Sequence, residues 1–203
     1  MARNPDPARK PELLEQILDY LLDKPLSNLT FRSLATALGV STFTLVYHFG
    51  TRAQLVSEIV KAISARATAI ESNLIENPGT LDAYFHGLEV SWEWTLDPTN
   101  RQLQRLEFEA AMLEALDPES HTYMRSLYEG WQRMGRNALL SFGLSEEDAE
   151  IESRLAVDTF YGIQLDLVIN QDDAKATLAF ERAMVRHRQR IEQLVAGNAI
   201  PAA

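Results

Sequence analysis

Residues 30–52 read TFRSLATALGVSTFTLVYHFGTR, and this stretch decides the fold. Its spacing predicts two short helices, 31–38 and 42–49, around a tight bend, which is the pattern of a helix-turn-helix. Ala35 is small enough to let the second helix cross the first closely. Gly39 supplies the left-handed residue that ends the first helix without steric cost. Four apolar side chains are expected to point inward: Leu34, Leu38, Val40 and Leu45.

Hydroxyl groups mark the helix starts in this stretch. Ser41 or Thr42 is expected to cap the second helix by accepting a free backbone N–H, and Thr51 with Gln54 forms a capping box for the next helix. The outer face of the second helix carries groups that can reach phosphates and base edges. An ordinary helical hairpin inside a core is the alternative. The outward groups are Thr42, Phe43, Thr44, Tyr47 and His48.

Composition excludes several classes of function. The chain has 203 residues, of which 46% are hydrophobic, so it can bury a substantial core. No signal peptide and no long apolar run is present, which predicts a cytoplasmic protein that does not enter a membrane. Cysteine is absent, which removes disulfides and thiol chemistry. We find no pattern for a catalytic site, a metal site or a cofactor.

The net charge of −10 is unevenly distributed along the chain. Residues 1–52 hold six basic and five acidic residues, whereas the remainder holds 13 basic and 24 acidic residues. The acidic excess therefore lies almost entirely outside the candidate helix-turn-helix. Such an acidic body weakens nonspecific DNA affinity, so a basic patch alone does not carry the argument.

Apolar periodicity predicts helices along the whole chain. Residues 1–10 are expected to form a flexible basic arm, and a first helix runs from Pro11 until Pro25 ends it. A long connecting helix runs from about residue 51 to 75, and Asn77-Pro78-Gly79 breaks it. No alternating strand pattern is present, so we predict an all-α fold of about nine helices. The remaining helices are expected at 81–95, 101–116, 120–142, 146–169 and 173–195.

The last two predicted helices each carry an apolar stripe that suits helix-on-helix packing. Both stripes could simply complete the core of one protomer. We favour a dimer interface, because a helix-turn-helix that reads a symmetric site usually does so as a two-fold pair. The candidate interface residues are Leu155, Thr159, Gly162, Ile163, Phe180, Met184, His187 and Ile191.

Residues 13–59 resemble the TetR family of transcriptional regulators. The resemblance implies a homodimeric, mostly repressing regulator with an N-terminal DNA-binding domain, here 1–52, and a C-terminal domain that binds an inducer and dimerises, here 53–203. Beyond this segment only the chain length and the helix count agree. The residues that carry the resemblance are Thr30, Leu34, Ala35, Leu38, Gly39, Val40, Ser41, Leu45, Tyr47, His48, Phe49, Arg52 and Leu55.

The resemblance implies that the helix 42–49 enters the major groove of DNA. Three residues depart from the family pattern: Phe43 replaces a small residue, Val46 a frequent Tyr and Gly50 a frequent Lys. We expect fewer phosphate contacts and a more apolar base contact as a result. By position, the candidate DNA-binding residues are Thr30, Arg32, Ser41, Thr42, Phe43, Thr44, Tyr47, His48 and Arg52.

Aromatic and methionine side chains gather in the middle helices, where a subset could line an effector cavity. Most of them are equally suited to an ordinary core. The candidate cavity residues are Trp92, Phe108, Met112, Tyr128 and Trp131, with Glu89, Glu109, Asp158 and Gln164 as candidate polar groups.

The leading hypothesis is a repressor that a small molecule releases from a palindromic operator in double-stranded DNA. Two alternatives stay open at this stage. One is a protein-interaction module with a degenerate DNA-binding head, which the departures at Phe43, Val46 and Gly50 would suit. The other is a helical small-molecule enzyme or carrier in which the hairpin is only structural.

Overall fold

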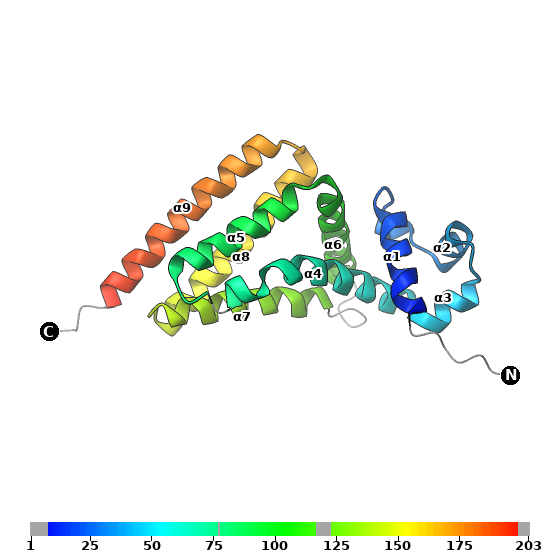
Figure 1. The fold of residues 1–203 in the computed structure, drawn as a ribbon, viewed down its shortest axis with the longest axis horizontal. Helices are drawn as coiled ribbons and strands as arrows, with labels where there is room; N and C mark the ends of the chain where they lie inside the picture. Colours follow the sequence, from blue (N-terminus) through cyan, green and yellow to red (C-terminus); the bar gives the residue numbers. More distant parts are fainter. Residues whose placement is uncertain (1–7, 77, 117–122, 199–203) are drawn as a thin grey trace. The chain divides into compact units, whose positions relative to one another are not determined.

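The structure is a computed structural model that describes residues 8–76, 78–116 and 123–198. Every regular element in these ranges is helical, which confirms the predicted all-α fold (Figure 1). No helix in them is long and apolar enough to cross a membrane. The elements are α1 (Arg9–Leu21), a 3₁₀ turn η1 (Leu26–Asn28), α2 (Phe31–Leu38), α3 (Thr42–Phe49), α4 (Arg52–Glu76), α5 (Leu81–Leu96), α6 (Pro98–Leu116), α7 (Tyr123–Ser141), α8 (Glu146–Asn170) and α9 (Asp173–Asn198).

The chain forms two compact units. The first comprises Met1–Ala65 and Gln102–Met124, and the second comprises Arg66–Arg101 and Arg125–Ala203. The first unit is larger than the segment 1–52 expected from the sequence. Two parts extend it: the beginning of α4, which is buried in its core, and most of α6, which bonds to the end of α1.

The core of the first unit is built from one face of each of its helices. α1 contributes a stripe at helical spacing, and α2 and α3 add the side chains that the sequence expected to point inward, with Leu34 and Leu45 fully buried. Phe49 at the end of α3 is buried as well. Side chains that are 2% exposed or less in this unit also include Leu13, Ile17, Leu18, Leu21, Leu26, Leu29, Leu55, Ile59, Val60, Ile63, Leu103 and Leu106.

α6 holds the loop between α1 and α2 through Arg105 and Glu109. The Arg105 guanidinium donates to the carbonyl of Leu21 at 2.9 Å, and it is also paired with Glu109. The Glu109 carboxylate accepts the N–H of Leu26. The sequence placed Glu109 among the polar groups of an effector cavity. In the structure it is a capping group for η1, because the backbone N–H at the start of a short helix lacks an internal acceptor.

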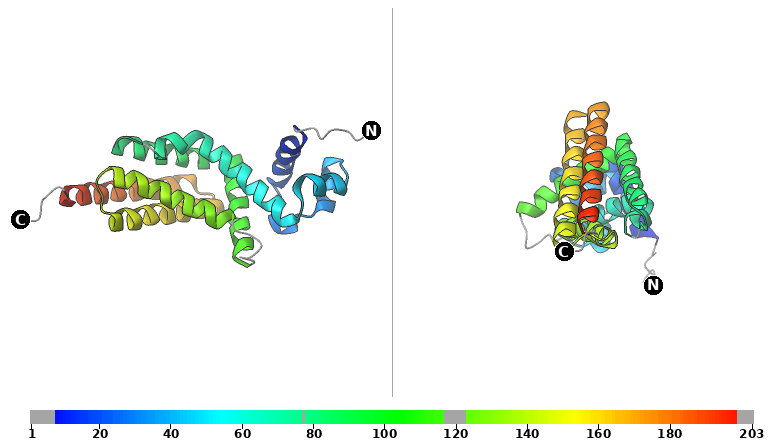
Figure 2. Two further views of the ribbon diagram at one scale, coloured as in Figure 1. Left: turned by 90° about the horizontal axis from the view of Figure 1, so that it is seen from below. Right: turned by 90° about the vertical axis from the view of Figure 1, so that its left-hand side faces the viewer.

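The second unit is organised around α8 and α9, which pack along each other in both views of Figure 2. They are joined by a tight turn in which Gln171 adopts a left-handed φ of 55°. α5 packs on α9. The core of this unit is made of Tyr84, Phe85, Trp92, Ala138, Leu139, Leu144, Ala149, Leu167, Ala176, Phe180, Met184 and Ile191.

Two helices begin earlier than the sequence indicated. α1 starts at Arg9, so Arg9 and Lys10 belong to its first turn and not to a flexible arm; residues 1–7 of that arm lie outside the described residues. Pro11 is tolerated there because the first N–H groups of a helix have no internal acceptor. α6 starts at Pro98 because the Asp97 carboxylate accepts the N–H of Thr99 at 2.8 Å. The expected start of α7 at residue 120 also falls outside the described residues.

Candidate nucleic-acid interface and effector groove

α2 and α3 both begin at side-chain caps, of which the sequence predicted the cap on α3. Thr30 and Ser33 form a reciprocal capping box at the start of α2, in which the Ser33 N–H donates to Thr30 Oγ1 at 3.1 Å. Gly39 ends α2 with a left-handed φ of 66°. Ser41, one of the two candidates, caps α3 by accepting the N–H of Thr44 at 3.0 Å. These caps fix both ends of the bend, so α3 is held in one orientation on the core of the first unit.

The outward face of α3 is apolar and aromatic. The Phe43 side chain is 78% exposed and that of Tyr47 is 60% exposed, and their rings stack with centroids 6.5 Å apart. Tyr47 also meets the ring of His48 edge to face at 5.1 Å. Thr42 is exposed beside them. Large apolar side chains that stay in water on a two-turn helix need an explanation outside the protomer.

Gly50 connects α3 to α4 in a conformation that only glycine adopts easily. Its φ is 67° and its ψ is −115°. A Cβ at this position would overlap Oε1 of Gln54, which is fixed because it accepts the N–H of Thr51 at 2.8 Å. From the sequence, Gly50 was interpreted only as the loss of a phosphate contact. The structure confirms the Thr51–Gln54 capping box. It also places Gln54 Oε1 where a side chain at position 50 would displace it.

Arg52 is bonded within the first unit. Its Nε donates to the carbonyl of Leu29 at 2.9 Å, and its Nη2 donates to those of Leu26 and Ser27 at 3.0 and 3.3 Å. Arg52 therefore caps the carbonyl end of η1. If Arg52 binds a DNA phosphate, it must do so while it holds these carbonyl groups, or it must release them. By contrast, Arg32 on α2 is exposed.

A hollow of about 460 Å³ lies beside the end of α3. Lys10 and Lys61 line it, and both are paired with Glu58, at 2.7 and 3.4 Å. The hydrogen bond from Lys10 is the main cause that holds the pKa of Glu58 below its usual range. Glu58 thus offsets positive charge close to His48 and Gly50, which line the same hollow.

The five candidate cavity residues are divided between the two compact units. Met112 on α6 is 64% exposed. Phe108 belongs to the first unit, whereas Tyr128 and Trp131 lie on α7 in the second, where the Tyr128 hydroxyl donates to Asp158 at 2.7 Å. Burial and that hydrogen bond to Asp158 raise the pKa of Tyr128. Of the five, Trp92 lines a pocket described below, and of the four polar candidates Glu89 does so too. Gln164 is buried and donates to Thr95 Oγ1 at 2.9 Å.

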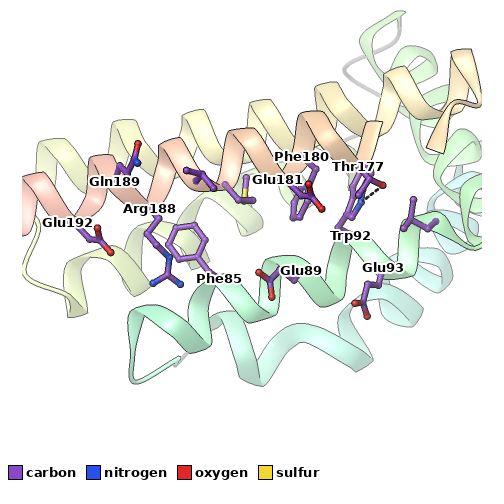
Figure 3. A pocket seen from close by; sticks show the side chains of 13 residues that line it. Phe85, Glu89, Trp92, Glu93, Thr177, Phe180, Glu181, Arg188, Gln189 and Glu192 are labelled. Carbon is purple, nitrogen blue, oxygen red and sulfur yellow. Dashed lines mark hydrogen bonds between the residues drawn. The ribbon is translucent and has the colours of Figure 1, made fainter. Parts of the chain in front are cut away.

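That pocket is a groove of about 650 Å³ between α5 and α9 (Figure 3). It is lined by Phe85 and Trp92 from α5 and by Phe180 and Met184 from α9. Trp92 and Phe180 stack with centroids 5.0 Å apart and ring planes 8° apart, and Trp92 Nε1 donates to Thr177 Oγ1 at 3.2 Å. We call it the α5–α9 groove. Its volume is within the range of small-molecule sites.

The fold built from these helices occurs in solved structures. No protein-family model matches this sequence, and no curated protein does. GusR from Salmonella enterica superposes with a TM-score of 0.69 at 16% identity, over 95% of this chain and 98% of that one. A TetR transcriptional regulator from Legionella pneumophila gives 0.66 at 15% identity, over 95% and 98%. NalD, the secondary repressor of the MexAB-OprM multidrug efflux pump in Pseudomonas aeruginosa, gives 0.58 at 16% identity, over 88% and 94%.

The chain has the fold of the TetR transcriptional regulators. These likenesses cover both compact units, so the TetR fold extends well beyond the segment 13–59 that the sequence resemblance rested on. At such low identity they establish the architecture, whereas function has to be argued from the sites.

Within this TetR fold, the two predicted dimer stripes have different surroundings. Phe180, Met184, His187 and Ile191 on α9 are core residues of the protomer, because α5 and α8 pack over them. Their side chains are therefore not available to a second protomer. On α8, by contrast, Leu155 is 53% exposed, and Thr159 and Gly162 are exposed as well. Ile163 is half-buried against the core.

Leu165 and Ile169, which sequence reasoning missed, complete the exposed apolar stripe on α8. Ile151, Leu165 and Ile169 are all exposed and share a face with Leu155 and Gly162, at spacings of three, four and seven residues. We call these five residues the α8 stripe. The helical spacing of these residues was visible in the sequence. Ile163 and Leu167, however, lie within two residues of Leu165 and belong to the buried face. Spacing alone does not say which face packs in the protomer and which is left for a partner.

Proposed function

We propose that this protein is a transcriptional regulator that binds double-stranded DNA through α3. The observation that carries the proposal is the exposure of Phe43 and Tyr47 on a helix whose two ends are fixed by caps. A short, rigidly held helix with an outward face of hydroxyl and aromatic groups suits the major groove, where apolar groups contact the thymine methyl and hydroxyl groups reach phosphates. In this proposal Phe43 would contact a base, and the phosphates would be bound by Thr30, Thr42, Thr44, Tyr47 and His48.

The proposal includes a homodimer that pairs through the α8 stripe. Five exposed residues without a charge run along one face of a 25-residue helix, from Ile151 to Ile169. Gly162 near the middle would let two such helices approach closely. Monomeric proteins rarely leave a patch of this length in water, and a two-fold pair is the arrangement that places two α3 helices in successive major grooves, about 34–36 Å apart.

We further propose that a small molecule releases the protein from DNA, as in a repressor. Support comes from the groove in the second unit, which lies on helices other than those of the DNA-binding head. NalD, which has the same fold, is described as a repressor. A ligand acts this way only if it binds the released state more tightly than the DNA-bound state.

The experiment that tests DNA binding is selection from a pool of random double-stranded oligonucleotides with the full chain. We expect enrichment of a palindrome whose half-sites are one helical turn apart. Tyr47→Ala should weaken binding to that palindrome at least tenfold. The matched control is Leu116→Ala, which removes an even more exposed apolar side chain from α6 and should leave DNA binding unchanged. No retained sequence at low salt would refute the function and favour a protein-interaction module.

The dimer is tested separately by sedimentation. Leu155→Arg places a charge in the α8 stripe and should give a folded monomer, because the side chain is exposed in the protomer and its replacement costs little there. Arg154→Leu, one position away, is the control and should remain dimeric. A Leu155→Arg protein that stays dimeric would show that the interface lies elsewhere.

A further inference from the structure

The α5–α9 groove has a floor and a rim of different chemistry. The floor contains the rings of Phe85, Trp92 and Phe180, which are nearly buried. Trp92 stacks on Phe180 and donates a hydrogen bond to Thr177 (Figure 3). The rim carries acidic side chains from both helices: Glu89 and Glu93 from α5, and Glu181 and Glu192 from α9.

Positive charge on this rim is scarce. Arg188 is the cationic residue among those that line the groove, and its guanidinium already has two partners. It lies over the ring of Phe85 at 4.5 Å and donates to the Asp82 carboxylate at 2.7 Å. Four glutamates against one arginine leave the lining with a net negative charge of three.

Three of the four glutamates also have no partner within the part of the chain that the structure describes. Among the residues that the structure describes, none donates a hydrogen bond or an ion pair to the carboxylates of Glu93, Glu181 or Glu192. Glu89 has a weak partner in His86, at 3.7 Å, and both of these side chains are exposed. The groove therefore presents carboxylates that a ligand can reach without displacing an internal ion pair.

We infer that the α5–α9 groove is a binding site for a small organic cation with an apolar, aromatic body. Aromatic faces attract cations, and the position of Arg188 over Phe85 shows one such contact on this very floor. An apolar body would rest on the parts of the rings that the groove leaves open, while the carboxylates of the rim offset its charge. An organic anion of the same shape would meet the repulsion of four glutamates, so charge is the property by which the site would select.

Coupling of this site to DNA rests on the proposed function, whereas the site itself does not. A ligand that bridges α5 and α9 prefers one spacing of these two helices, and a change in that spacing is what an effector requires. Occupancy and release of DNA are therefore measured separately.

The experiment compares two ions of nearly identical shape and opposite charge, tetraphenylphosphonium and tetraphenylborate. Each is titrated into the full chain at low salt, with binding followed by calorimetry and by quenching of tryptophan fluorescence. We expect saturable binding of one tetraphenylphosphonium per protomer, and binding of tetraphenylborate that is at least tenfold weaker. The triple variant Glu89→Gln, Glu181→Gln, Glu192→Gln should weaken tetraphenylphosphonium binding about tenfold.

The matched control neutralises three exposed glutamates on α8, Glu146, Glu147 and Glu150, and should leave tetraphenylphosphonium binding unchanged. Equal binding of both ions would overturn the site, because it would show that binding depends on hydrophobicity alone. Equal loss of binding in both triple variants would also overturn it, because it would show that only the overall charge of the protein matters. Saturable, groove-dependent binding by a protein that binds no DNA would support the site and refute the regulator. DNA binding without any tetraphenylphosphonium binding would support the regulator and refute the site.

Discussion

Arg105 on α6 donates from Nη2 to the carbonyl of Leu21, the last residue of α1, across 2.9 Å and 84 positions of sequence. The same nitrogen lies 3.4 and 3.3 Å from the carbonyls of Leu22 and Lys24. Nε donates to Gln102, and Nη1 is paired with Glu109. One guanidinium thus caps the carbonyl end of α1 and, through Glu109, the start of η1. α6 is in this way built into the core that carries α3.

Arg105→Lys should therefore be a costly change, although it preserves the charge. An ammonium cannot reproduce a planar fork that serves three directions at once, and hydrogen bonds of charged groups contribute about 1.5–3 kcal/mol when partly buried. We expect the free energy of unfolding, measured in urea, to fall by about that amount. Arg136→Lys is the control, since Arg136 makes one bond to an exposed partner, Glu146. Equal effects of the two substitutions would mean that the guanidinium geometry is not what matters.

Phe43 should contribute specificity by contact with a thymine methyl group. Replacement of each operator thymine in turn by deoxyuridine removes only that methyl. At the contacted position the wild-type protein should lose about fourfold in affinity, the value of one buried methyl group. Phe43→Ala should be insensitive to the same replacement, because no ring is left to cover the methyl. If the loss persists in Phe43→Ala, another residue makes this contact.

Glu58→Gln should strengthen DNA binding. The substitution frees Lys10 and Lys61, which line the hollow beside the end of α3. One offset negative charge at a partly exposed site is worth about 0.2–1 kcal/mol, so the dissociation constant should fall about two- to fivefold and its salt dependence should steepen. Glu147→Gln on α8 removes the same charge far along the chain and serves as the control. A weaker complex would show that Glu58 positions Lys10 for DNA instead of restraining it.

Local chemistry explains which parts of this structure were predictable. Gly39, Ser41 and the Thr51–Gln54 pair act on backbone groups within a few residues, so their roles follow from sequence spacing alone. The positions of the helices could also be predicted from the sequence, because apolar residues recur at helical spacing within each of them. On α3, Thr42, Phe43 and Tyr47 are exposed as expected, whereas Thr44 and His48 are half-buried.

Tertiary partners explain what the sequence left undecided. The stripe from Phe180 to Ile191 looks like any apolar seam, and only the packing of α5 and α8 shows that it is core. From the sequence, Glu109 was indistinguishable from a cavity carboxylate, because its partner, the N–H of Leu26, is 83 positions away along the chain. The α5–α9 groove likewise joins residues nearly a hundred positions apart, and periodicity does not report such pairings.

His187 should make the stability of the protein depend on pH. It is buried between Tyr84, whose hydroxyl lies 3.4 Å from Nε2, and Glu152, whose carboxylate lies 3.8 Å from Nδ1 and is also bonded by Arg190. Burial lowers the pKa of His187 from 6.5 to about 4. Between these values the unfolded chain binds a proton that the folded chain does not, so stability is lost as the pH falls from about 6.5 to about 4.

The expected loss attributable to His187 is about 2–4 kcal/mol in the free energy of unfolding between pH 7 and pH 4. Urea unfolding at a series of pH values measures it, as the difference between the wild type and His187→Gln, whose side chain does not titrate. His86→Gln is the control, because it removes an exposed imidazole that the core does not enclose. An unchanged pH profile in His187→Gln would mean that the folded protein already accepts the proton, with Glu152 stabilising the imidazolium.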